Sequence, residues 1–349
     1  MADTAGEKPL VVVTGASGFV GKWVVIELLK RGYRVRGTVR SDAKAEQVRA
    51  TVTQLLGEEA AGRLETCHLD LLDDKGWAEA MQGASAVMHV ATQIAAEEPK
   101  DSSIVVRPAI EGTERALRFA HAAGIKRVVI TSSIATVGYG HGQTTGKRVY
   151  DETHFTNLDN MKWTWAYCIG KTTAERAAWA YADANGMELT TIHPGMIFGP
   201  AVDLDTSISL MAVGGLLDGS MPALPKNGFT VSDVRDVAEM HVMALEKPEA
   251  IGQRYLATGT YLPFPRIAEI LRTAYPHAKV TLKTVPDWLI RLLVNIPGSP
   301  IRQIINDIGN EKHYDGRKGE ALLGHPFRSP EEATLSAAES LIRLGVVNI

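Results

Sequence analysis

The stretch V-T-G-A-S-G-F-V-G, residues 13–21, constrains the fold more than any other part of the chain. It joins the apolar run P-L-V-V-V-T-G, typical of a buried parallel strand, to a run with helical spacing that stops at Gly32. Glycines let the backbone turn tightly and approach a pyrophosphate, and the helix N-terminus offers free N–H groups. A tight turn without a ligand is the alternative, but the strand–loop–helix context favours a dinucleotide. The predicted contacts are Gly15, Gly18, Phe19, Val20 and Gly21.

Strands and helices alternate over the first two hundred residues. Apolar or alternating runs predict further strands, and helical spacing predicts helices between them. This alternation predicts an α/β fold with a doubly wound parallel sheet of the Rossmann type. The predicted strands after the first are 33–40, 63–70, 85–92, 126–133, 188–195 and 253–259, and the predicted helices include 43–56, 73–81, a segment ending at Gly124, 162–186 and 234–247.

The pattern changes after residue 200. Glycine and proline become frequent in G-G-L-L-D-G-S-M-P-A-L-P-K-N-G, and the segment from 260 onward reads as mostly helical with proline breaks. We therefore expect a cofactor-binding Rossmann domain made of 8–200 plus about 232–259. A smaller, discontinuous substrate-binding domain, about 201–231 plus 260–349, is expected over the carboxyl edge of the sheet.

Composition narrows the class of protein. The net charge is -3, and no basic run interleaved with aromatics favours nucleic acid. The two cysteines, Cys67 and Cys168, are too few for a disulfide framework. Neither a signal peptide nor an apolar run of membrane-spanning length is recognised, so a cytoplasmic protein is expected. A monomer or a homodimer is expected, because the small residues of T-T-A-E-R-A-A-W-A-Y-A suit a subunit contact, although alanine is also simply a good helix former.

The end of the second predicted strand indicates which nicotinamide cofactor is used. An NAD site usually has an acid there for the ribose 2′-hydroxyl. The sequence R-V-R-G-T-V-R-S-D-A-K instead offers Arg40, with Arg36 before it and Lys44 after it. Asp42 is near, but it can equally cap the helix that starts at Ala43. A guanidinium can form a fork onto a 2′-phosphate, so we predict NADP(H) bound by Arg40 and Lys44; a solvated basic turn is the alternative.

The ends of the third and fourth strands complete the predicted cofactor site. Asp70 is placed to accept a hydrogen bond from the adenine amino group, and Leu71 packs beside it. His89 is interpreted as a packed histidine, and no H-E-x-x-H motif or Cys/His cluster indicates a metal. The backbone that follows His89 is expected to line the cofactor at Val90, Ala91 and Thr92.

A Tyr/Lys pair suggests the chemistry. Tyr167 and Lys171 lie at i and i+4, on one face of a predicted helix. Carbonyl reduction needs a proton donor, and an ammonium together with oxidised nicotinamide is expected to lower the phenol's pKa from about 10. The fifth strand ends in Thr131, Ser132 and Ser133, where a hydroxyl can stabilise a developing alkoxide and Thr131 can contact the cofactor.

These motifs together carry a family resemblance. The set T-G-A-S-G-F-V-G, T-V-R, H-V-A-T, R-P-A-I-E-G-T, T-S-S-I-A-T-V and Y-C-I-G-K, with V-R-D-V-A-E-M-H-V-M-A-L-E further on, resembles the dihydroflavonol reductase-like group of extended short-chain dehydrogenases/reductases. That group includes cinnamoyl-CoA reductases and NADPH-dependent carbonyl reductases. The resemblance covers roughly residues 8–260. It implies Ser133 as the catalytic serine, with Ser132 as second choice, Tyr167 and Lys171 as its partners, and cofactor contacts at Pro194, Ile197 and Ser209.

Two departures from the group bear on the substrate. Gly138 stands where dihydroflavonol reductases carry a polar residue, and Thr164, Trp165 and Ala166 replace the K-N-W of cinnamoyl-CoA reductases. A reductase of varied aldehydes and ketones is therefore the expectation. An aromatic-lined pocket from Trp163, Trp165 and Phe198 is weighed against a role for each of them in the core.

The expected function is NADPH-dependent reduction of hydrophobic or aromatic carbonyl compounds to alcohols. A 3β-hydroxysteroid dehydrogenase-like enzyme, or a nucleotide-sugar epimerase or dehydratase, is the alternative on the same fold. A sugar-nucleotide enzyme needs cations for the diphosphate, and no cluster is evident among Arg254, Arg266, Arg272, Arg291 and Arg302. A non-enzymatic NADP sensor would not need the Ser/Tyr/Lys set.

Overall fold

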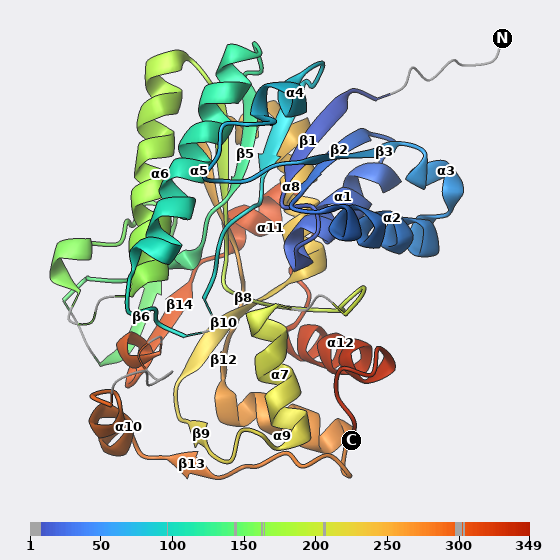
Figure 1. Cartoon of the computed structure of the whole chain (residues 1–349). Helices are drawn as coiled ribbons and strands as arrows, with labels where there is room; N and C mark the ends of the chain where they lie inside the picture. Colours follow the sequence, from blue (N-terminus) through green and yellow to red (C-terminus); the bar gives the residue numbers. More distant parts are fainter. Residues whose placement is uncertain are drawn as a thin grey trace.

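A parallel sheet forms the centre of the molecule (Figure 1). The computed structural model describes residues 8–95, 97–142, 145–161, 163, 165–204, 207–296, 302 and 304–349. Every strand pair in the sheet is parallel, which confirms the predicted doubly wound fold. The strand order is β11 (Gln253–Ala257), β7 (Glu188–Pro194), β5 (Arg127–Thr131), β4 (Ala86–His89), β1 (Leu10–Thr14), β2 (Arg34–Val39) and β3 (Leu64–His68).

Helices cover both faces of this sheet, because successive residues of a buried strand point to opposite sides. Val11 and Val13 of β1 enter one core and Val12 enters the other. The first core is covered by α1 (Phe19–Lys30), α2 (Asp42–Leu56), α8 (Val234–Glu246) and α11 (Arg317–Leu323). The second is covered by α4 (Trp77–Met81), α5 (Ser103–Ala122) and α6 (Ala166–Asn185), and the short α3 (Glu58–Ala61) follows α2.

Short strands and helices lie beyond the carboxyl edge of the sheet, in the lower half of Figure 1. A third core joins Leu210, Leu224, Ile267 and Ala337. The helices are α7 (Ile208–Asp218), α9 (Phe264–Ala274), α10 (Asp287–Leu293) and α12 (Pro330–Arg343). The strand pairs are β8 (Met196–Phe198) and β12 (Tyr261–Pro263) on either side of β10 (Gly228–Asp233), β9 (Leu224–Pro225) with β13 (Thr284–Val285), and β6 (Gly146–Tyr150) with β14 (Asn310–Tyr314).

The pairing of β6 with β14 connects the two predicted domains. β6 belongs to the sequence range expected for cofactor binding, and β14 to the range expected for substrate binding. The helix α11, also from the second range, packs on α8 and β11 of the first. The division into two domains therefore stays a prediction, while the segments 146–150 and 317–323 each pack across the expected boundary.

One local expectation is corrected. Helix α2 begins at Asp42 and is capped by Ser41, whose side chain accepts from the Lys44 N–H, so Asp42 is not the cap.

The small residues Ala174, Ala178 and Ala182 of α6 are buried inside the molecule, while the choice between monomer and homodimer stays a prediction. A Cβ added at Gly170 would lie 3.2 Å from Ala109 Cβ of α5, so small side chains there allow two helices to approach closely.

Within the described part of the chain, no helix is both long and apolar enough to cross a bilayer. Cys67 is partly buried and Cys168 is buried, and both are free thiols.

Candidate active site

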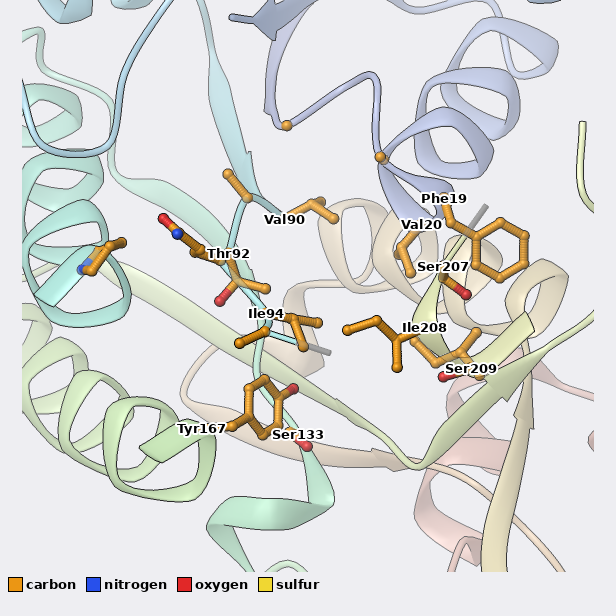
Figure 2. A pocket seen from close by; sticks show the side chains of 18 of the residues that line it. Phe19, Val20, Val90, Thr92, Ile94, Ser133, Tyr167, Ser207, Ile208 and Ser209 are labelled. Carbon is orange, nitrogen blue, oxygen red and sulfur yellow. The ribbon is translucent and has the colours of Figure 1, made fainter. Parts of the chain in front are cut away.

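One cavity of about 790 Å³ opens at the carboxyl edge of the sheet, where β1 to β5 meet α6, α7 and α9 (Figure 2). This is the edge at which ligands bind in open parallel sheets. Most of the residues predicted from the sequence line this single cavity. They are Gly15, Gly18, Phe19, Val20, Gly21, Arg40, Lys44, Asp70, Leu71, Val90, Ala91, Thr92, Ser133, Tyr167, Ile197 and Ser209.

The three glycines of the loop differ in what their missing side chain permits. Gly15 has a positive φ of 68°, and a Cβ there would lie 2.9 Å from Ala91 Cα. A Cβ at Gly21 would lie 2.1 Å from the Gly15 carbonyl oxygen, so both glycines are needed for packing inside the loop. Gly18 is different, because its nearest protein atom would be the same oxygen at 3.4 Å. Gly18 therefore leaves open space on the cavity side.

This space fits a dinucleotide phosphate. No side chain caps the N-terminus of α1, so its first N–H groups remain available beside the cavity. The buried hydroxyl oxygen of Thr92, at the end of β4, has no hydrogen-bond partner among the described residues. A bound ligand with hydroxyl or phosphate oxygens would satisfy both sets of polar groups.

The cationic end of the cavity lies next to the carboxyl end of β2. Arg40 and Lys44 line it, whereas Asp42 is 97% exposed and pairs with His68, 3.1 Å away. Arg36, which the sequence grouped with them, donates to backbone carbonyls at the end of α4. The cations at this end are therefore Arg40 and Lys44, and the nearby acid points elsewhere.

Ser133 and Tyr167 lie side by side on one wall of the cavity (Figure 2). Ser133 follows β5 and caps a short 3₁₀ turn, where its Oγ accepts from the Ala135 N–H at 3.1 Å. Burial raises the pKa of the Tyr167 phenol, and a hydrogen bond with Ser133 only partly offsets it. Burial is therefore the largest influence on the pKa of this phenol, and its expected lowering by Lys171 together with oxidised nicotinamide stays a prediction.

Three predicted residues do not line the cavity, namely Lys171, Thr131 and Pro194. They lie behind the wall that Ser133 and Tyr167 form. The Lys171 ammonium donates to the Thr131 carbonyl at 2.8 Å, and burial lowers its pKa to about 8. The Thr131 hydroxyl lies 2.7 Å from His241 Nε2, so it is already engaged. Pro194 ends β7, and its successors reach the cavity instead, at Gly195, Met196 and Ile197.

His89 is a packed histidine, as expected. Its Nδ1 lies 2.9 Å from the Thr14 hydroxyl and its Nε2 lies 3.4 Å from that of Thr113. Burial, with a smaller contribution from Lys171, lowers its pKa to about 3, so the imidazole is neutral. The described residues contain no group of three or more potential ligands that could hold a metal ion.

Apart from Trp165, the residues that form the far wall of the cavity were not predicted from the sequence. Trp165 packs between Tyr167 and Tyr139, with ring centroids 5.3 and 5.5 Å away. The Tyr139 hydroxyl lies 3.2 Å from both carboxylate oxygens of Asp307, which also pairs with Lys312. The other missed residues on this side are mainly apolar, namely Ile94, Ile134, Ala135, Met196, Ile208, Ala212, Phe229, Phe264 and Ile304.

The three aromatic residues considered for a pocket lie in three different places. Trp165 lines the cavity, Phe198 is buried in the third core, and Trp163 packs in a separate cluster with α10. Thr164 lies outside the described residues. Gly138 does not line this cavity either. A Cβ added there would lie 2.2 Å from the Tyr314 hydroxyl oxygen of β14. A polar side chain at 138 would require that ring to move.

A glycine loop at β1, cations behind β2 and a Ser/Tyr pair between β5 and α6 share one cavity, which is the arrangement of a short-chain dehydrogenase/reductase in its extended form. The family model of the NAD dependent epimerase/dehydratase family matches residues 11–257, and the chain belongs to this family. The chain is 38% identical over 283 residues to cinnamoyl-CoA reductase 1 of Oryza sativa subsp. japonica, covering 81% of this chain and 80% of that protein.

Two further comparisons agree with the predicted enzyme class. Dihydroflavonol 4-reductase of Zea mays is 35% identical over 283 residues, covering 79% of this chain and 77% of that protein. The crystal structure of the yeast methylglyoxal/isovaleraldehyde reductase Gre2, complexed with NADPH, superposes with a TM-score of 0.77 at 26% identity, covering 97% of this chain and 99% of that one. These findings confirm the predicted group, the oxidoreductase class and the NADP(H) cofactor.

Proposed function

We propose that the protein reduces hydrophobic or aromatic aldehydes and ketones to alcohols, with NADPH as cofactor. The observation that supports this most is the single cavity that joins Gly18, Arg40 and Tyr167. Among the described residues that line it, Arg40 and Lys44 are the only Lys or Arg side chains, and both lie at the cofactor end. The substrate end is lined mainly by apolar side chains, which suit an uncharged carbonyl compound.

The same distribution weighs against the sugar-nucleotide alternative. A nucleoside diphosphate substrate needs cations at the substrate end of the cavity. Arg254 is buried against Glu175, and Arg291 donates to the Ile308 carbonyl at 2.7 Å, so neither lines the cavity.

The proposed roles follow from the geometry. The cofactor supplies the hydride to the carbonyl carbon when it is bound. Ser133 donates a hydrogen bond to the carbonyl oxygen, and Tyr167 gives that oxygen its proton. The raised pKa of Tyr167 keeps the phenol protonated at neutral pH, which suits a donor in the direction of reduction. Lys171, one turn further along α6, donates one of its three N–H groups to the Thr131 carbonyl; with the others it would hold the ribose of the nicotinamide, and its charge would favour the phenolate left after proton transfer.

A panel of neutral aromatic aldehydes, aryl ketones and a steroid tests the proposal, with NADPH consumption followed by absorbance. We expect the wild type to reduce aromatic carbonyls, and Tyr167→Phe to lower kcat by roughly 10²–10⁴-fold. The NADPH Kd of this variant should stay within about twofold, because the glycine loop is untouched.

The control is Tyr181→Phe, the same change on the exposed part of α6, where the hydroxyl only approaches His121. It should keep wild-type turnover. Wild-type turnover in Tyr167→Phe would rule out the proton donor, and a wild type without activity on any carbonyl would rule out the function.

A further inference from the structure

A buried ion pair lies behind the wall that carries Ser133 and Tyr167. Glu175 is on α6, one turn after Lys171 and two turns after Tyr167, so the three share a face of the helix. It is 3% exposed, and Arg254 of β11 donates from Nε to its Oε1 at 2.7 Å. Charges are costly to bury, so such a pair calls for an explanation. The proposed reaction has no use for either group in contact with the substrate.

The Glu175 carboxylate is connected to the end of β5 by hydrogen bonds. The Ser132 hydroxyl donates to Oε2 at 2.5 Å. His193 of β7 lies with Nε2 3.5 Å from Oε1 and with Nδ1 3.2 Å from the Ser133 carbonyl oxygen. Thr136 donates to the same carbonyl at 2.9 Å. The carboxylate thus holds Ser132 directly and the Ser133 carbonyl through His193.

The same carboxylate acts on Lys171. Lys171 is 8% exposed, and its neighbours include the Thr131 carbonyl, the neutral imidazoles of His89 and His193, and the Tyr167 phenol one turn away. Among the groups that act on Lys171, Glu175 is the one that raises its pKa, against the larger lowering by burial.

Glu175 itself remains ionised. Burial opposes its charge, but the Arg254 guanidinium and the hydrogen bond from Ser132 favour the carboxylate, and its pKa lies below the ordinary value. The Arg254 guanidinium, which also donates to two backbone carbonyls near residue 153, keeps the carboxylate fixed.

We propose that Glu175 is a positioning residue that keeps Lys171 in its ammonium form and holds Ser132 and Ser133 at the end of β5. This inference rests on the proposed function. Variants can separate the two effects. The effect on the Lys171 ammonium depends on the charge of residue 175, and the effect on Ser132 and Ser133 depends on its shape. Glu175→Gln keeps the shape and loses the charge, whereas Glu175→Asp keeps the charge and shortens the side chain.

The experiment compares the pH profiles of kcat and of the NADPH Kd, with a neutral aldehyde that has no ionisable group. Activity that needs the Lys171 ammonium falls as pH rises through its pKa, so this is the basic limb. Loss of the negative charge makes Lys171 release its proton at lower pH. We expect Glu175→Gln to move the basic limb of both profiles down by about one to two pH units. Glu175→Asp should leave the limb in place and lower kcat at all pH values.

Glu175→Gln leaves Arg254 unpaired in the interior, so the double variant E175Q/R254Q provides a second version without the carboxylate. It should move the basic limb in the same direction, by less than Glu175→Gln because the positive charge of Arg254 is removed as well, with folding checked by thermal melting. A basic limb at the wild-type position in folded Glu175→Gln or in the double variant would overturn the proposal, and so would an equal shift in Glu175→Asp. The profile of the NADPH Kd needs no turnover, so it tests Glu175 even if the reductase assignment fails.

Discussion

The two ends of the cavity are built in different ways. The cofactor end is formed largely by backbone, from the Gly15–Gly21 loop and the residues that follow β4. The substrate end is formed by side chains such as Trp165, Tyr139 and Asp307, which come from segments far apart in the chain. A backbone site tolerates few substitutions, because a Cβ added at Gly15 or Gly21 meets neighbouring main chain. A side-chain site can change its ligand while the fold stays the same.

The largest expected effect tests the backbone end. Gly15→Ala adds a Cβ 2.9 Å from Ala91 Cα at a positive φ. A left-handed conformation costs about 1–2 kcal/mol and overpacking about 1–3 kcal/mol. We expect the NADPH Kd, measured by titration, to rise by roughly 100-fold, since each 1.4 kcal/mol is a factor of about ten.

Gly32→Ala is the matched control, because Gly32 has a φ of 84° and an added Cβ would meet nothing within 4 Å. It should lower the free energy of unfolding by about 1–2 kcal/mol and leave the Kd unchanged. An equal rise in Kd for both variants would mean that the loop acts through stability alone.

An intermediate effect is expected for the side chain that selects the cofactor. Arg40→Ala removes a guanidinium from the cationic end of the cavity. Because the side chain is exposed, water screens part of the interaction, and we expect KM for NADPH to rise roughly tenfold with KM for NADH little changed. Steady-state kinetics with both cofactors measures the ratio. Arg34→Ala, at the other end of the same strand, should not alter it, and an unchanged ratio in Arg40→Ala would remove this residue from the cofactor site.

The smallest effect is expected at the substrate end. Trp165→Leu removes ring contacts with Tyr139 and Tyr167. Aromatic pairs contribute about 0.5–1.5 kcal/mol, so KM for an aryl aldehyde should rise roughly threefold to tenfold, with the NADPH Kd unchanged. Trp163→Leu is the control, because Trp163 packs with α10 outside this cavity. A change in the NADPH Kd for Trp165→Leu would mean that the two ends of the cavity are not independent.

The cofactor end of the cavity could be predicted from the sequence more completely than the substrate end. The glycine loop, Arg40 and the Tyr167/Lys171 pair are local patterns whose spacing carries their geometry. The central sheet followed from alternating strands and helices. The far wall did not, because it depends on strands whose partners are distant in the sequence, such as β6 with β14. Periodicity can indicate a strand, but it cannot identify the strand's partner.

Two polar contacts of α6 could not be predicted from the sequence either. The i, i+4 spacing placed Lys171 near Tyr167 correctly, but it could not show that the ammonium would bind the Thr131 carbonyl. Nor could it show that the first turn of α6 is capped by Glu98, whose carboxylate accepts from the Ala166 N–H at 2.8 Å. Burial and long-range partners determine both, and neither is encoded in a local pattern.

The pairing of β6 with β14 has a consequence for the order in which the protein is made. A growing chain emerges from its N-terminus, so the nucleotide loop and Tyr167 are synthesised long before Asp307 and the strand at Asn310–Tyr314. During that interval β6 lacks its neighbour, and the substrate end is open to water. The wall of the cavity that contains Asp307 can therefore form only after this late segment has been added.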